Sequence, residues 1–228
     1  PRARKVLQAV TEADVSNAAF PFATCREIGI AGAPVRALRI TYVGELGWEL
    51  HMPSETAPSV YDRLVDAGVG FGIGNCGYRA IESLRLEKGY RAWGSDITAD
   101  DTPIEAGLGF AVKLRGNQPF QGRDALLRQR EVGVRKRLAC FTVDDPDVVL
   151  LGRETLYRDG ERVGYLASAG YGHTVGQGIG YGYVRAAQPI DNTHVETGIY
   201  ELEVAGTRVP CRVHTQALYD PAMQRVKA

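Results

Sequence analysis

The feature that most constrains the fold is a change of pattern near residue 134. Before it, apolar residues recur at helical spacing in several segments, and after Lys136 these helical patterns stop. Short apolar segments follow, with the spacing and glycine turns that are typical of a small antiparallel barrel. The turn signals are Asp159-Gly160, Gly170-Tyr171-Gly172, Gly176, Asp191-Asn192 and Ala205-Gly206. We therefore predict a β-barrel domain over residues 134–228.

The earlier part of the chain mixes helical and extended patterns. Residues 2–14 and 78–88 place apolar side chains at helical spacing, while residues 35–42 alternate apolar and polar positions as a half-buried strand does. We also expect a strand over residues 108–114 and a helix over residues 122–130. The predicted fold class is therefore α+β, with the small antiparallel β-barrel following the α+β part.

This pattern divides the chain into an α+β domain over residues 1–133 and the barrel domain over residues 134–228. The chain begins at Pro1, with neither an initiator Met nor the apolar core of a signal peptide, and a helical pattern starts at once. We therefore expect a piece of a longer protein, in which the N-terminal part of the α+β domain precedes Pro1.

Composition argues against several kinds of partner. The chain has 27 basic and 27 acidic residues and no formal net charge, so no electrostatic attraction to nucleic acid is expected. No apolar run approaches the ~20 residues that span a bilayer, so a membrane is not expected either. The cysteines are far apart and have no histidine at ligand spacing, which favours reduced, buried thiols and no metal. They are Cys25, Cys76, Cys140 and Cys211.

The segment YVGELGWE, residues 42–49, carries more glycine and acid than a plain hairpin needs. In an alternating strand Glu49 faces away from Trp48, where it is either a solvated acid or a ligand-binding carboxylate. A carboxylate accepts two parallel N–H donors, as the amino-pyrimidinone edge of a pterin presents them. Gly44 and Gly47 remove side chains nearby, which would admit a flat ring. Tyr42 comes close if the segment folds back.

Arg79 lies in the first turn of the helix predicted over residues 78–88. A cation there opposes the helix dipole, unless an anion binds at that end to the free N–H groups and the guanidinium. The alternative is a pair with Glu82 or Ser83 one turn later. Trp93, after the helix, is either a core residue or a stacking surface for an aromatic ligand. Arg85 and Glu87 are better explained as structural residues.

Three segments in this order resemble the aminomethyltransferase family, which includes the T-protein of the glycine cleavage system. They are YVGELGWE, GYRAIESLRLEKGYRAWGSDI and DTPIEAGLGF. The chain departs from the common pattern at Val43, Leu46 and Tyr78. The resemblance is strongest to the C-terminal half of flavin-dependent demethylating dehydrogenases, of the sarcosine or dimethylglycine type. It is carried by the segments VGELGWELH, GYRAIESLRLEKGYR and ADVSNAAFPF.

The resemblance implies a tetrahydrofolate site at the centre of three subdomains. By motif position, Glu49 holds the pterin edge, Tyr42 lines the pterin pocket and Arg79 binds the carboxylate of the glutamate tail. Trp93 is a weaker candidate for contact with the aromatic parts of folate. The catalytic Asp of the family lies upstream of this chain, so no catalytic residue is assigned here and the fragment alone is expected to be inactive.

The resemblance also implies partners and a parent protein. An upstream flavin domain holds FAD, and the first folate subdomain of the same parent chain completes the folate site. The implied function is capture of a one-carbon unit as methylene-tetrahydrofolate. The alternatives are a T-protein-like aminomethyltransferase and a non-catalytic folate-binding or interaction module. Members of the family occur in the mitochondrial matrix and in bacterial cytoplasm.

Overall fold

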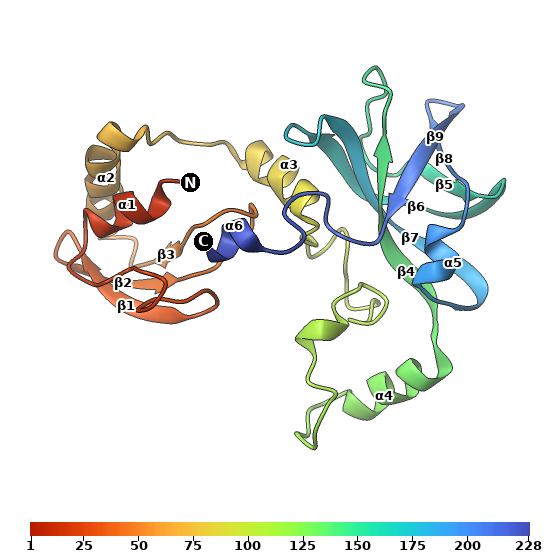
Figure 1. Ribbon diagram of the computed structural model, residues 1–228, viewed down its shortest axis with the longest axis horizontal. Coiled ribbons are helices and arrows are strands. Elements are labelled where there is room, and N and C mark those ends of the chain that lie inside the picture. The colour runs from red at the N-terminus through yellow and green to blue at the C-terminus, as the bar shows by residue number, and fades with distance from the viewer. The chain divides into compact units, whose positions relative to one another are not determined.

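The computed structural model describes all of residues 1–228, which form two compact units (Figure 1). The first unit contains Pro1–Leu84 together with Asp220–Ala228, and the second contains Arg85–Tyr219. The predicted division into domains at residues 133 and 134 stays a prediction. None of the helices combines the length and the apolar character that crossing a membrane requires.

The first unit contains both helices and strands, and strands dominate the second. The elements in chain order are α1 (Ala3–Gln8), β1 (Cys25–Ile30), β2 (Ala33–Leu38), β3 (Glu49–His51), α2 (Ala57–Gly68), the 3-10 helix η1 (Val69–Phe71), α3 (Tyr78–Lys88), the 3-10 helix η2 (Gly109–Ala111), α4 (Arg123–Val132), β4 (Val134–Val143), β5 (Thr155–Arg158), β6 (Glu161–Gly172), β7 (Gln177–Ile190), α5 (Asn192–Glu196), β8 (Tyr200–Val204), β9 (Thr207–His214) and α6 (Gln224–Lys227).

The first unit is built on an antiparallel sheet with the strand order β1-β2-β3. Ala31 and Gly32 close the β1–β2 hairpin with φ values of 51° and 76°, as a two-residue turn that matches the twist of the strands requires. Alternate side chains of β2 are buried, as are Ile28 and Ile30 of β1, so one face of the sheet packs against α1 and α2. The core they share includes Ile28, Ile30, Val35, Ala37, Leu7 and Val60.

The C-terminal segment belongs to this first unit. Val226 of α6 is fully buried. Arg39 is also fully buried, and its guanidinium donates to the carbonyl oxygens of Val226 at 3.1 Å and Ala228 at 3.2 Å. These bonds attach the last residues of the chain to the first unit. They also replace the hydration that the Arg39 guanidinium loses when it is buried.

The second unit contains a closed antiparallel barrel with the strand order β4-β7-β6-β5-β8-β9. The prediction of an α+β fold with a small antiparallel barrel is confirmed, and the first strand of the barrel, β4, begins at Val134. Phe141 and Val143 of β4 contribute to one core cluster, whereas Leu138 and Cys140 contribute to another. This alternation follows from the two-residue period of a strand, and both faces of β4 are therefore covered.

The last turn of α3 packs on the barrel strands. Leu86 is fully buried and shares a cluster with Leu138, Cys140, Ile179, Tyr181 and Tyr183. Glycines of β6 make room for it: a Cβ at Gly170 would lie 3.1 Å from the Leu86 side chain, and one at Gly172 would lie 3.1 Å from that of Glu87. Gly170-Tyr171-Gly172 was predicted as a turn, but it lies within β6 and pairs with β7, where its glycines permit a close approach of the helix.

Several sequence predictions need correction. The helix expected in residues 2–14 ends at Gln8, and the strand expected in residues 35–42 ends at Leu38. Residues 108–114 form no strand, because η2 coils there and Phe110 is 88% exposed. The helical pattern of residues 78–88 also predicts Tyr78 on the inner face of the helix, but Tyr78 is 81% exposed. All four cysteines are free, as expected, but Cys25 and Cys76 are exposed rather than buried. In the last three cases an apolar side chain lacks the tertiary partner that the local pattern assumed.

Candidate functional site

Glu49 lies on the outer face of the sheet in the first unit. It begins β3, where it pairs with Leu38 of β2, and His51 pairs with Arg36. The Glu49 side chain is 46% exposed, and its carboxylate lies 3.5 Å from Nε2 of His51. An exposed ion pair of this kind contributes little to stability, so the carboxylate remains available as an acceptor.

Trp48 faces the other way and anchors the strand. Its ring packs edge-on against Phe20, with 6.0 Å between ring centroids. The guanidinium of Arg39 lies 4.7 Å from the Trp48 ring centroid, a favourable cation–π geometry. Trp48, Leu50 and Met52 pack against the core, whereas Glu49 and His51 are exposed. The predicted alternation is therefore observed.

The glycines before β3 occupy a bend. Gly44 has a φ of 75°, a conformation that favours glycine. A Cβ at Gly47 would meet only the carbonyl oxygen of Glu45, at 3.9 Å, so the space beside it is open. Tyr42 precedes the bend and is 36% exposed. The carboxylate of Glu45, within the bend, lies 3.8 Å from the guanidinium of Arg225.

Arg79 is exposed in the first turn of α3, as predicted. Its guanidinium makes no hydrogen bond and no ion pair, so the alternative of a pair with Glu82 or Ser83 is not realised. The eight residues before the helix, 70–77, are exposed apart from Phe71, which is partly buried. The positive charge of Arg79 therefore stands at the amino end of a helix with no counterion.

Trp93 belongs to the second unit and is 74% exposed. It is therefore not the core residue that one alternative described. A bridge between Trp93 and Ile97 closes a turn around it. Its exposure makes it available for stacking, and this turn is one of the tightly bonded segments of the unit.

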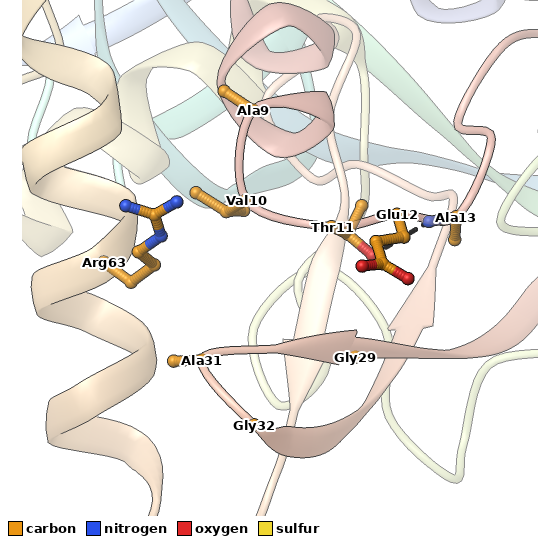
Figure 2. A pocket seen from close by; sticks show the side chains of 9 residues that line it. All are labelled: Ala9, Val10, Thr11, Glu12, Ala13, Gly29, Ala31, Gly32 and Arg63. Carbon is orange, nitrogen blue, oxygen red and sulfur yellow. Dashed lines mark hydrogen bonds between the residues drawn. The ribbon is translucent and has the colours of Figure 1, made fainter.

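Two hollows of the first unit are lined by residues other than the four that are predicted to contact folate. Glu49 and Arg79 make no ion pair with each other. Figure 2 shows a hollow of the first unit, with a volume of about 580 Å³, between the loop after α1, the β1–β2 hairpin and Arg63 of α2. A second hollow of about 580 Å³ lies on the Trp48 and Leu50 side of β3. Neither is lined by any of the four predicted residues.

Sequence reasoning missed a buried polar cluster in the second unit. Arg85 and Asp96 are both fully buried and form an ion pair. Asp96 Oδ1 accepts a 2.5 Å bond from the hydroxyl of Ser168 on β6. Glu87, also buried, accepts from the backbone N–H groups of Thr174 at 2.5 Å and Val175 at 3.0 Å. The only sequence signal was charge on the buried side of a helix.

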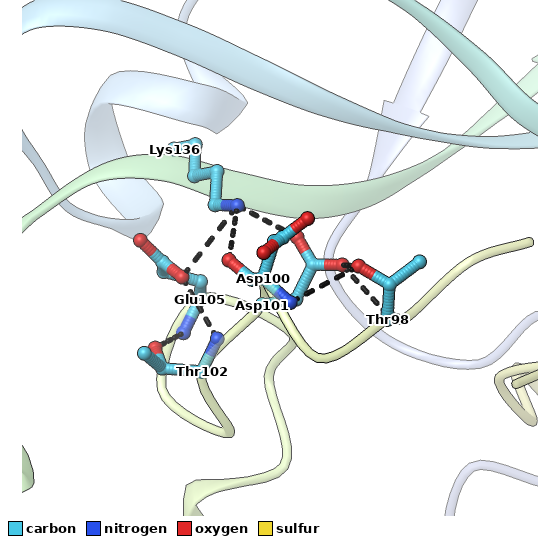
Figure 3. Close-up of polar contacts among 6 residues, drawn as sticks. All are labelled: Thr98, Asp100, Asp101, Thr102, Glu105 and Lys136. Atoms are coloured by element: carbon cyan, nitrogen blue, oxygen red, sulfur yellow. Dashed lines mark hydrogen bonds and ion pairs between the residues drawn. The ribbon is translucent and has the colours of Figure 1, made fainter. Parts of the chain in front are cut away.

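The DTPIEAG segment is also structural (Figure 3). The N–H of Thr102 donates to Glu105 at 2.9 Å, and the N–H of Glu105 donates to the Thr102 hydroxyl at 3.2 Å. Lys136 of β4 donates to Asp101 at 2.7 Å. Burial alone would raise the pKa of Asp101, but the bonds from Lys136 and Thr98 outweigh it and leave the pKa below its ordinary value. This network ties the segment to the barrel.

Comparison with known proteins places these features in a family. Residues 1–116 match the GCVT N-terminal domain, and residues 136–220 match the glycine cleavage T-protein C-terminal barrel domain. The chain therefore belongs to the glycine cleavage T-protein family. This assignment agrees with the resemblance seen in its three sequence motifs.

Individual proteins similar to this chain show which branch of the family it resembles. The chain is 46% identical over its whole length to the mitochondrial sarcosine dehydrogenase of Mus musculus, and 38% identical to the mitochondrial dimethylglycine dehydrogenase of the same organism. It spans 25% and 26% of those proteins, about a quarter of their length. The crystal structure of the glycine cleavage system aminomethyltransferase T from Bartonella henselae superimposes with a TM-score of 0.78 at 26% identity, over 97% of this chain and 58% of that one.

The residues present fit a folate and do not form a metal site. An exposed acceptor-only carboxylate and an unpaired guanidinium suit an amino-pyrimidinone edge and a carboxylate tail respectively. No group of three or more His, Cys, Asp or Glu side chains lies close enough to hold a metal ion. The first unit therefore offers polar groups for an organic anion.

Proposed function

We propose that these residues are the tetrahydrofolate-binding C-terminal part of a flavin-dependent demethylating dehydrogenase of the sarcosine or dimethylglycine type. The observation that carries the proposal is the 46% identity to a sarcosine dehydrogenase along the entire chain. The alignment covers the whole chain and therefore includes both units. The parent protein would hold FAD in a separate upstream domain, and no residue of this chain is assigned to FAD.

The proposed roles follow from chemistry and from motif position. Glu49 accepts two N–H bonds from the pterin edge, and Tyr42 lines the pocket beside it. Arg79 pairs with a carboxylate of the glutamate tail, where the amino end of α3 adds a favourable dipole. Trp93 contacts an aromatic part of the ligand. The exposure of Glu49 and the absence of a counterion at Arg79 support these roles.

Tetrahydrofolate, when bound, supplies the nitrogen that takes up a one-carbon unit as methylene-tetrahydrofolate. This chain would hold the pterin and the tail in a fixed orientation, which raises the effective concentration of that nitrogen. It would also keep the unit from leaving as free formaldehyde. The first folate subdomain of the parent protein would contribute the catalytic carboxylate.

A second candidate is an aminomethyltransferase that acts on a lipoyl-carried aminomethyl group. The TM-score of 0.78 to the Bartonella henselae aminomethyltransferase T favours it. The two candidates differ in the chemistry of the parent protein rather than in the proposed folate contacts.

One experiment separates the two candidates. The protein at its natural length is mixed with sarcosine or dimethylglycine, and flavin reduction is followed with and without tetrahydrofolate. The proposal predicts reduction of the flavin, with methylene-tetrahydrofolate replacing free formaldehyde as the product when tetrahydrofolate is present. A protein that leaves both amines untouched, but transfers an aminomethyl group from a lipoyl carrier, would contradict the proposal and support the second candidate.

A further inference from the structure

The C-terminal segment Asp220–Ala228, here called the strap, is held on the first unit through its carbonyl oxygens and one apolar side chain. Arg39 donates to the carbonyl oxygens of Val226 and Ala228. Arg4 of α1 donates to the same Ala228 oxygen at 2.8 Å. The Val226 side chain is fully buried. Because every residue has a carbonyl oxygen, the Val226 side chain is the part of the strap that a substitution can most readily release.

The two arginines that hold the strap also lie against Trp48. The guanidinium of Arg39 is 4.7 Å and that of Arg4 is 5.9 Å from the Trp48 ring centroid. Burial, and to a smaller extent the neighbouring Arg4, lowers the pKa of Arg39. Neighbouring like charges repel each other, and the partly negative carbonyl oxygens of the strap offset that repulsion. The strap therefore helps to keep both cations at the Trp48 ring, where a cation–π contact is favourable.

Trp48 ends the bend of residues 42–48, which the sheet itself does not hold. Three residues of β2 pair with β3, and none of them belongs to the bend. Its order therefore depends on tertiary contacts. The strap supplies one directly, since Arg225 lies 3.8 Å from Glu45, but this ion pair contributes little because Arg225 is 60% exposed. The stronger connection between strap and bend is the pair of cations at Trp48.

We propose that the strap is a conformational element that orders the bend, which is fixed while Val226 is docked and loosens when the strap is released. Tyr42 lies in the bend and Glu49 follows it directly, so release of the strap would also lower the fraction of molecules in which these two residues are in place. The consequence for folate rests on the proposed function, whereas the ordering of the bend does not.

Substitutions in the strap test this role in the protein at its natural length. Val226→Asp releases the strap because it places a carboxylate at a buried apolar site, and Val226→Ala is the milder variant, which only leaves a cavity. Gln224→Asp is the matched control, since it introduces the same side chain into α6 at an exposed position. A synthetic peptide with the sequence of the strap, DPAMQRVKA, is added in excess to the Val226→Asp protein, and the same peptide with the Val226→Asp change serves as its control.

The first readout is hydrogen exchange of the bend amides, measured by mass spectrometry. We expect Val226→Asp to speed exchange in the bend about 10-fold or more and Val226→Ala to speed it less, while α2 keeps its protection in both. Gln224→Asp should exchange like the wild type. The second readout is the ¹⁹F NMR signal of 5-fluorotryptophan at position 48, assigned by its loss in Trp48→Phe. Release of the strap should move this signal, because the guanidiniums then leave the ring.

Faster exchange that is confined to the bend, and that the intact peptide reverses but the changed peptide does not, would support the proposal. Wild-type exchange of the bend in both Val226 variants would overturn it, as would faster exchange that the intact peptide does not reverse. If Val226→Asp fails to fold, exchange in Val226→Ala decides the matter.

Ligand affinity is a separate measurement. Tetrahydrofolate affinity should fall about 3- to 10-fold in Val226→Asp, as a smaller competent fraction predicts, and should remain unchanged in Gln224→Asp. If the wild-type protein binds no tetrahydrofolate, the proposed function fails, and the exchange of the bend amides still decides the role of the strap.

Discussion

The two ends of α3 place charged side chains in opposite environments. Arg79, in the first turn, is exposed and has no counterion, whereas Arg85 and Glu87 near the other end are buried and fully bonded. Both ends belong to a single motif, YRAIESLRLEK. The comparison shows that one family motif combines a residue available for a ligand with residues that hold the fold. The two kinds should respond differently to substitution.

The largest expected difference is between the two arginines of the helix. Arg85→Met leaves Asp96 as a buried charge without its partner, so we expect the free energy of unfolding of the second unit to fall by about 3–5 kcal/mol. Arg79→Met should change it by less than ~0.5 kcal/mol, because the side chain is exposed and unpaired. Urea denaturation followed by circular dichroism measures both values. Equal losses would remove the distinction between the two ends.

Substitution of Glu87 tests the same end of α3, and we expect it to lower the free energy of unfolding somewhat less than substitution of Arg85 does. Glu87→Ala leaves the N–H groups of Thr174 and Val175 without their acceptor, which we expect to cost roughly 2–3 kcal/mol of unfolding free energy. Glu131→Ala on α4 is the control, since Glu131 is exposed and should be nearly neutral. A loss in Glu87→Ala no greater than in the control would mean that water replaces the carboxylate.

A still smaller effect concerns pH. His214 of β9 bonds with Thr142 at 3.0 Å, and burial, with the nearby Arg212, lowers its pKa despite the opposing effect of Asp144. The unfolded chain therefore takes up a proton at higher pH than the folded one. Stability from neutral His214 is complete above pH ~6.5 and decreases as the pH falls through the folded-state pKa.

Replacing the imidazole should remove that part of the pH dependence. His214→Gln keeps a polar side chain near Thr142 but does not titrate, so unfolding free energy should change less between pH 7 and pH 5 than in the wild type. Thermal unfolding across this range measures the slope. An identical slope in both proteins would show that His214 keeps an ordinary pKa in the folded state.

The sequence was most informative where local patterns decide the structure. The period of residues 78–88 and the glycine after them predicted α3 with its observed bounds, and the pattern change near residue 134 predicted an antiparallel barrel after the last helical pattern. Residues 108–114 failed because a strand needs a partner that no local pattern can supply. The same limit applies to Arg85, whose buried partner Asp96 lies eleven residues away, beyond the reach of helical spacing.

For the candidate site, too, the sequence predicted only what local patterns decide. The alternation of the strand predicted that Glu49 and Trp48 point to opposite faces of the sheet. The helical pattern predicted that Arg79 lies in the first turn of α3, and the structure has it there. The bonds of Asp96 to Ser168 join segments 72 residues apart, and only coordinates bring them together. The roles of Tyr42, Glu49, Arg79 and Trp93 toward folate stay predictions.

Titration calorimetry with tetrahydrofolate tests the central claim most directly. The protein at its natural length is compared with Glu49→Gln and Arg79→Ala, and with the controls Glu27→Gln and Arg63→Ala, which change exposed residues of the same unit. We predict that affinity falls roughly 10- to 100-fold in each of the first two variants, as loss of a charge-assisted bond implies, and that both controls bind like the wild type. Equal affinity in all five proteins would contradict the assignment of Glu49 and Arg79 to the folate site.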